Sequence, residues 1–178
     1  MTPPPRPPAG PLSDGVVTLR PWREEDVPAI VAICDDPDVA RFTRVPSPYT
    51  EQDARDFLAG TVVEELGFAI VSATDEDDVL GSIGIRDAGE ERADIGYLVR
   101  APARGRGVAS RALRLLSDWA LGDDGGMGRV QLVTRPDNVA SQRTAERAGF
   151  RREGLLRAYM LVKGARHDAI MFSRVRGD

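Results

Sequence analysis

A short run rich in arginine and glycine, "RGRGVA" (104–109), separates an apolar segment from an amphipathic one. The apolar segment, "ADIGYLV" (93–99), has the length and composition of a buried strand. The amphipathic segment places small and apolar residues on one helical face: Ala109, Ala112, Leu113, Leu116 and Ala120. A helix that starts directly after a strand leaves its first amide groups without intrahelical partners. The chain is therefore expected to fold around a strand–turn–helix unit whose turn can hold an anion.

The residues of this turn favour a phosphate as the anion. Gly105 and Gly107 remove side chains that would keep a ligand away from the backbone. Guanidinium groups grip phosphates through paired donors, and four of them surround the turn, at Arg100, Arg104, Arg106 and Arg111. A glycine-rich turn with exposed arginines that bind nothing has the same sequence, so both interpretations remain open at this point.

Two other phosphate-binding motifs are disfavoured. A Walker loop needs G-x-x-x-x-G-K-[ST], and the chain contains no Lys-Ser or Lys-Thr pair. A dinucleotide fingerprint places Gly or Ala where Ser110 stands, and no second strand with an acidic end follows at the required distance. The turn is thus expected to bind a different phosphate-bearing molecule.

Strand patterns in the rest of the chain predict an α+β fold. They occur at 16–22, 67–73, 79–87 and 129–135, and two further strands surround the "KGAR" turn within 150–176. Segment 27–34 has helical spacing. The order of elements predicts a mostly antiparallel sheet in which strand 93–99 crosses over to a parallel strand, 129–135.

Local signals delimit two of the other helices. Thr50 with Asp53 is a start signal, and Gly60 is a stop signal. Asn138 or Asp137 is expected to cap a helix that ends before Gly149.

One domain preceded by a tail accounts for the 178 residues. Residues 1–14 are rich in proline and lack the apolar core of a signal peptide, so we expect a flexible, polyproline-like tail. A ligand for a proline-binding module has a similar composition. Residues 15–178 are expected to form a single domain.

The bulk properties of the chain narrow the function classes. A formal net charge of -4 disfavours binding to nucleic acid through overall charge. Cys34 is the only cysteine and His167 the only histidine, so no metal site is expected. No apolar run approaches the roughly 20 residues of a membrane span. We therefore expect a cytoplasmic protein that binds neither nucleic acid nor a membrane.

Several segments in register carry a family pattern. The turn "RGRGVA" fits the signature Q/R-x-x-G-x-G/A, and "RPDNVASQRTAERAGFRREGLLR" fits N-x-x-S…GF-x-x-E-G-x-L-R. "LRPWREEDVPAI" is typical of a first strand and helix, and "KGARHDAIMFSRV" of a final hairpin. Together, over about 16–176, they resemble the GNAT superfamily of acyl-CoA-dependent N-acetyltransferases. The RimJ/RimL branch, which acetylates the N-termini of ribosomal proteins, is the most similar.

The resemblance implies the fold and the co-substrate. It implies the GNAT fold, a mixed, mostly antiparallel seven-stranded sheet flanked by helices and splayed between the fourth strand (93–99) and the fifth (129–135). The pantetheine arm of acetyl-CoA would lie in the splay, and no metal is implied. The residues that the resemblance assigns to acetyl-CoA are Leu98, Val99, Arg104, Gly105, Arg106, Gly107, Val108, Ala109, Asn138 and Ser141. A homodimer also fits the branch.

The reaction that the resemblance implies needs an oxyanion donor and an acid for the departing thiolate. The amide of Val99 is the natural oxyanion donor. Many GNAT enzymes supply the acid with a tyrosine where this chain has Ala145, and the RimL-like pattern suggests Ser141 instead. Tyr159 is a second candidate acid, although packing in the core also explains it. A purely structural role is also open for Ser141, whose hydroxyl could bond to a free backbone group in the first turn of the helix.

The base that would deprotonate the amine is less evident. Asp94 alternates with Gly96 and Leu98 on one face of the strand that enters the site. Glu153 is an alternative. The glutamate expected a few residues after "EGLLR" is absent, because Met160 occupies its position.

The lack of an obvious strong base bears on the acceptor. An α-amine with a pKa of about 7.7–8.0 is roughly 10–20% neutral at pH 7, whereas a lysine amine near 10.4 is below ~0.1% neutral. We therefore expect transfer of an acetyl group to a protein N-terminus or a small amine. Two alternatives remain: a non-catalytic acyl-CoA sensor, and an aminoglycoside or polyamine acetyltransferase with an acidic pocket from 24–26, 35–38 and 75–78.

Overall fold

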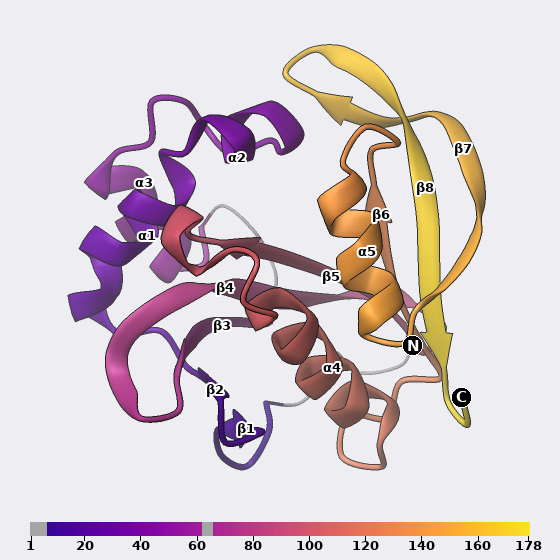
Figure 1. The fold of residues 1–178 in the computed structure, drawn as a ribbon, viewed down its shortest axis with the longest axis horizontal. Coiled ribbons are helices and arrows are strands. Elements are labelled where there is room, and N and C mark those ends of the chain that lie inside the picture. Colours follow the sequence, from indigo (N-terminus) through magenta and orange to yellow (C-terminus); the bar gives the residue numbers. More distant parts are fainter. Residues whose placement is uncertain (1–6, 62–65) are drawn as a thin grey trace.

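The computed structural model describes residues 7–61 and 66–178, which form one mixed sheet with helices on both faces (Figure 1). The strands are β1 (Leu12–Ser13), β2 (Val17–Arg20), β3 (Leu66–Ser72), β4 (Asp75–Gly89), β5 (Arg92–Val99), β6 (Arg129–Thr134), β7 (Arg151–Val162) and β8 (Ala165–Val175). The helices are α1 (Val27–Cys34), α2 (Pro37–Phe42), α3 (Glu51–Leu58), α4 (Val108–Leu121) and α5 (Val139–Arg147), with short 3-10 turns η1 (Glu24–Asp26) and η2 (Ala101–Ala103). Within the described ranges no helix is both long and apolar enough to span a bilayer.

The sheet has eight strands in the order β1-β2-β3-β4-β5-β6-β8-β7. Every neighbouring pair is antiparallel except β5 and β6, which confirms the predicted mixed topology. The extra strand, β1, was not predicted, because a two-residue strand has no periodicity to detect. It lies inside the segment expected to be a flexible tail, so that expectation is wrong for Leu12 and Ser13. Residues 1–6 of that segment lie outside the described residues.

The sheet is splayed between its central strands, as expected. β5 pairs with β6 through three residue pairs only: Arg92–Arg129, Ala93–Val130 and Asp94–Gln131. Beyond them, β5 continues to Val99 and stays paired with β4 alone. Figure 1 shows the two strands diverging. The part of β5 from Ile95 to Val99 therefore has one unpaired backbone edge that faces the gap.

Two apolar cores lie on opposite faces of the sheet. One contains Ile95 of β5 and the buried face of α4, and Tyr97 packs against it. The other contains α1 and Ala54 of α3, and Leu98 packs against it. This alternation follows from the period of two along a strand. One β5 face therefore points toward α4 and the other toward α1 and α3.

Short-range signals explain where several helices begin. Thr50 accepts a hydrogen bond from the amide of Asp53, and the carboxylate of Asp53 accepts one from the amide of Thr50. This confirms the predicted helix start. α4 begins after Gly107, whose backbone is left-handed with φ 78°. Asn138 caps α5 by accepting from the amide of Ser141 at 3.1 Å.

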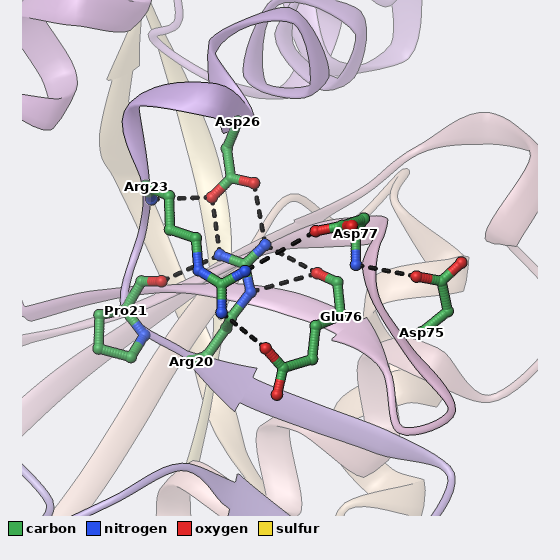
Figure 2. Close-up of polar contacts among 7 residues, drawn as sticks. All are labelled: Arg20, Pro21, Arg23, Asp26, Asp75, Glu76 and Asp77. Atoms are coloured by element: carbon green, nitrogen blue, oxygen red, sulfur yellow. Dashed lines mark hydrogen bonds and ion pairs between the residues drawn. The ribbon is translucent and has the colours of Figure 1, made fainter.

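A buried ion pair fixes the chain between β2 and α1 (Figure 2). The guanidinium of Arg20 donates to both carboxylate oxygens of Asp26, at 2.7 and 2.9 Å. Arg20 also donates to the backbone oxygen of Glu76 at 2.8 Å, so it joins the start of β4 to η1. The side chains of Arg20 and Asp26 are only 4% and 7% exposed. Burial acts to raise the pKa of Asp26, but hydrogen bonds from Arg20 and Arg23 outweigh it and lower the pKa.

Candidate active site

The turn between β5 and α4 exposes a row of backbone donors. Gly105 and Gly107 adopt left-handed conformations with φ 74° and 78°. The amide of Arg104 donates to Ala101 and the amide of Arg111 donates to Gly107. Between them, the amides of residues 105–109 donate to no group in the described part of the chain. A Cβ atom on Gly105 would meet nothing within 4 Å, so a ligand can approach this backbone closely. The turn thus has the geometry of an anion site.

Most of the arginines around the turn are already engaged, contrary to the sequence-based expectation. Arg104 forms ion pairs with Asp36 at 3.0 Å and with Asp38 at 3.2 Å. Arg111 pairs with Asp14 at 2.6 Å. Arg100 pairs with Asp78. The charge of these three side chains is therefore largely neutralised, because each already has a carboxylate partner.

Arg106 differs from the other three. It is exposed and has no ion pair with any residue that the structure describes. The backbone amides and Arg106, rather than four arginines together, are the groups available to an anion. The sequence could not show this because the acidic partners lie far away along the chain.

The backbone of β5 presents alternate residues to the gap. The amide of Arg100 donates to Leu80 of β4 at 3.0 Å. In an antiparallel ladder, every second residue bonds to the same neighbour, so Leu98 also faces β4. Val99 and Tyr97 therefore direct their amides toward the gap. The predicted contacts of Val99 keep their geometric basis, whereas the backbone of Leu98 points away from the gap.

The start of α5 brings a serine hydroxyl to β5. The hydroxyls of Ser141 and Tyr97 lie 2.9 Å apart, at hydrogen-bonding distance. The hydroxyl of Tyr97 is also 3.4 Å from the carbonyl oxygen of Ser141. Burial raises the pKa of Tyr97, against the lowering effect of hydrogen bonds with Ser141 and Thr144, so the phenol keeps its proton at neutral pH. Tyr97 can therefore donate to Ser141, which leaves the serine proton free for another acceptor.

Tyr97 is not among the site residues predicted from the sequence. It reads as one aromatic residue in a buried strand, and Ser141 is 44 positions away. The sequence contains a weak indication of its role: Ile95, Tyr97 and Val99 share one face of β5, and of these three only Tyr97 carries a polar group. The pattern along β5 does not show that the start of α5 lies beside Tyr97 in the folded chain.

One cavity of about 1210 Å³ connects the turn, the gap and the start of α5. Its lining includes Val99, Gly105, Gly107, Asn138 and Ser141. The same cavity extends over the sheet face covered by α1 and α3, where its lining is largely apolar: Trp22, Ile30, Phe42, Tyr49 and Phe57. The volume exceeds the roughly 300–1,000 Å³ of a pocket for one small molecule. Two reactants can therefore meet in it.

The other candidate acids and bases lie elsewhere. Tyr159 is 52% exposed on β7 and does not line the cavity, so packing in the core does not explain it either. Asp94 does not line the cavity; its carboxylate accepts from Arg86 and from Gln131, each at 2.9 Å. Ala145 is fully buried. Among these candidates, the structure brings only Ser141 to the gap.

Glu153 is unsuited to act as a base. Hydrogen bonds from Arg129 and Ser173 lower its pKa from 4.5 to about 2. A carboxylate with such a low pKa accepts protons poorly at neutral pH. The contacts of Glu153 with β6 and β8 indicate a structural role.

We expect the stability of Glu153→Gln to depend less on pH in the acidic range than that of the unmodified protein. Because the folded-state pKa of Glu153 lies below its ordinary value, its contribution is fully present above about pH 4.5 and is lost as the pH falls toward about 2. Urea unfolding midpoints measured across this window should fall less steeply in the variant than in the unmodified protein. Glu90→Gln is a matched control, because the side chain of Glu90 is 85% exposed. Identical slopes for Glu153→Gln and the unmodified protein would contradict this assignment.

Comparisons with known proteins agree with this geometry. The family model described as Acetyltransferase (GNAT) domain matches residues 17–151. The uncharacterized N-acetyltransferase p20 of Bacillus licheniformis is 29% identical over 170 residues, which cover 90% of this chain and 93% of that relative. The ribosomal-protein-serine acetyltransferase of Escherichia coli (strain K12) is 29% identical over 131 residues, covering 71% and 72% of the two chains.

A solved structure shows the same architecture. Mycobacterium smegmatis RimJ in complex with CoA-disulfide superposes with a TM-score of 0.77 at 26% identity, covering 93% of this chain and 86% of that one. The family model spans most of the chain, and the splayed sheet with its exposed turn amides is the architecture that the family resemblance implied. The chain therefore belongs to the GNAT family of acetyl-CoA-dependent N-acetyltransferases.

Proposed function

We propose that the protein transfers the acetyl group of acetyl-CoA to the α-amine of a peptide or protein N-terminus. The choice of acceptor rests on one observation: the carboxylates that line the cavity already have hydrogen-bond or ion-pair partners. Asp38 pairs with Arg104, Asp53 is held in the capping box of α3, and Asp137 pairs with Arg135 at 2.8 Å. These carboxylates are already engaged, so an amine that is partly neutral at pH 7 suits the cavity best.

The residues of the cavity fit acetyl-CoA. The turn offers unpartnered amides for a diphosphate, and the gap offers the free edge of β5 for an amide-containing arm. Asn138 uses its side-chain oxygen to cap α5, which leaves its amide group free to donate into the cavity. When bound, acetyl-CoA supplies an activated thioester. We assign Gly105, Arg106, Gly107, Val108, Ala109, Val99 and Asn138 to its binding.

Two groups would then act on the reacting atoms. The amide of Val99 faces the gap and would donate to the oxygen of the acetyl carbonyl as negative charge develops there. As the amine nitrogen bonds to the carbonyl carbon and the carbon–sulfur bond breaks, Ser141 would donate its proton to the sulfur. The nitrogen would release its surplus proton to water, and the serine oxygen would regain a proton from water. Tyr97 would hold the serine oxygen in place and donate to it. A thiol with a pKa of ~8.5 needs only a weak acid.

A relative supports the acceptor class. The Escherichia coli protein described above is a ribosomal-protein-serine acetyltransferase, and its similarity covers 71% of this chain. Polyamines and aminoglycosides fit less well. Each acidic run expected to attract them has at least one member in an ion pair: Asp26 with Arg20, Asp36 with Arg104, and Glu76 with Arg23.

An assay of free thiol release with an amine panel tests this proposal. Purified protein and acetyl-CoA would be mixed with a peptide bearing a free N-terminus, the same peptide with a blocked N-terminus and an internal lysine, spermidine, and an aminoglycoside. We expect thiol release with the free N-terminus only, and mass spectrometry should place the acetyl group on the α-amine. Preferential release with spermidine or the aminoglycoside would overturn the acceptor class. Calorimetric binding of CoA without thiol release for any amine would favour a sensor.

We expect Gly107→Ala to weaken CoA binding about 10-fold. Gly107 has φ 78°, and an alanine in the left-handed region costs roughly 1–2 kcal/mol, so the turn would shift its amides away from the diphosphate. Calorimetric titration with CoA measures the effect. Gly164→Ala is a matched control: Gly164 has φ 80° and open surroundings, but lies in the β7–β8 turn. Equal CoA affinities for both variants would count against the assigned turn.

A further inference from the structure

A row of glycines crosses the sheet beside the gap. In the register of the sheet, Gly67 of β3 lies opposite Gly84 of β4, and Gly84 lies opposite Gly96 of β5. These three residues lie on the face that also carries Leu98, which packs against the core of α1 and α3. Three aligned glycines leave a strip of the sheet without side chains. The strip points toward the helices that wall the apolar end of the cavity.

Part of this strip is open. Gly84 and Gly96 line the cavity, and Gly96 is exposed. A Cβ atom on Gly96 would meet nothing within 4 Å, and its backbone lies outside the left-handed region. Since conformation and packing both permit a side chain at Gly96, neither one requires glycine there. The open space above Gly96 is therefore a feature of the cavity and not a result of tight packing.

Aromatic rings close one end of the strip. A Cβ atom on Gly67 would lie 3.6 Å from the indole nitrogen of Trp22 and 3.7 Å from the ring of Phe57. The two rings meet edge to face, with centroids 6.0 Å apart. Trp22 and Phe57 thus cover Gly67, whereas Gly84 is buried and Gly96 is exposed. The open part of the strip has an apolar wall at this end.

An ion pair borders the strip on the side away from Leu98. Arg86 and Asp94 lie opposite each other in the next row on the same face, and the guanidinium of Arg86 donates to Asp94 at 2.9 Å. Both carboxylate oxygens of Asp94 are engaged, because the other accepts from Gln131. The side chains on this border are polar, but they form hydrogen bonds with one another. An uncharged apolar group therefore suits the strip better than a charged one.

We propose that this glycine strip receives the first side chain of the peptide acceptor and favours a large, apolar first residue. The inference rests on the proposed N-terminal acetylation. The floor is open at Gly96 and reaches Gly84 on the neighbouring strand, about 4.8 Å away, and it has an aromatic end wall, so a flat or branched apolar side chain can lie on it. A serine or alanine side chain is too small to bury much apolar surface on the strip.

Peptides that differ only in their first residue test this inference. We expect kcat/KM for Phe- and Leu-initiated peptides to exceed that for Ser- and Ala-initiated peptides by about 10-fold, since one or a few buried methylene groups discriminate by that order. Gly96→Val fills the strip from its floor. It should lower kcat/KM for the Phe peptide about 10-fold, through KM, and change the value for the Ser peptide by less than about 2-fold.

Two controls separate this effect from misfolding and from loss of co-substrate. Gly154→Val adds the same side chain to β7, where Gly154 also has open surroundings and an ordinary backbone, and it should leave the peptide preference unchanged. Calorimetric affinity for CoA should be the same in Gly96→Val and the unmodified protein. Equal kcat/KM values across the peptides, or a uniform loss in Gly96→Val, would overturn the inference while the proposed function stands. Absence of turnover with every peptide would overturn both.

Discussion

Replacing Ser141 by alanine is expected to lower kcat about 100-fold while leaving the affinity for CoA nearly unchanged. A positioned general acid contributes roughly 10²–10⁴-fold, and the low pKa of a departing thiol places this case at the lower end. Of the two acids predicted from the sequence, Ser141 and Tyr159, only Ser141 lines the cavity. Steady-state kinetics with a free N-terminal peptide, combined with CoA titration, would separate loss of chemistry from loss of binding.

The companion variant Tyr97→Phe tests the link between the two hydroxyls. It removes one oxygen and keeps the ring that packs against the α4 core. We expect kcat to fall about 10-fold, since one hydrogen bond contributes on the order of 1 kcal/mol. If Tyr97 acts through Ser141, the double variant should be no slower than Ser141→Ala alone. Multiplicative losses would show that the two residues act independently, and an unchanged kcat in Ser141→Ala would remove the serine from the mechanism.

Replacing Asp26 by alanine should lower the free energy of unfolding by about 3–5 kcal/mol. The variant leaves the guanidinium of Arg20 buried without its carboxylate partner, and removing one member of a buried ion pair has a cost of this order. Arg20 keeps its bonds to the backbone oxygens of Pro21 and Glu76, which is why a larger loss is not expected. Urea denaturation at pH 7, followed by circular dichroism, measures the change in midpoint.

Glu76→Ala is the matched control for Asp26→Ala. It removes the exposed ion pair with Arg23 but keeps the Glu76 backbone oxygen that accepts from Arg20 (Figure 2). Exposed pairs contribute about 0–1 kcal/mol, so the midpoint should barely move. Equal losses in the two variants would contradict the assignment of stability to the buried pair. Because η1 carries Asp26 and follows Trp22, loosening this pair should also disturb the apolar wall of the cavity.

Features that depend on nearby residues could be predicted from the sequence. The helix start at Thr50 and Asp53 needs two residues three positions apart, and the backbone donors of the turn follow from glycines between a strand and a helix. The strands that form the mixed sheet have regular periodicity over several residues. Each of these signals is contained in one short segment, so no tertiary information is needed.

The contacts that decide the chemistry could not be predicted, because they join distant segments. Arg104 reads as a phosphate ligand until the sheet brings Asp36 and Asp38 beside it. Tyr97 reads as core until the start of α5 meets it. In both cases the deciding partner comes from a distant segment: the start of α2 for Arg104 and the start of α5 for Tyr97. Local patterns therefore predict which segments line the cavity, but they do not show which of its side chains are already paired.

The three residue pairs between β5 and β6 have a consequence for how the molecule is held together. The sheet consists of a five-stranded and a three-stranded part whose main chains meet along a very short seam. Any molecule that lies along the free edge of β5 extends that seam, as an added strand does. The acetyl donor would thus be a structural component as well as a reactant, and the spent coenzyme, which keeps the same arm, would brace the two parts equally well.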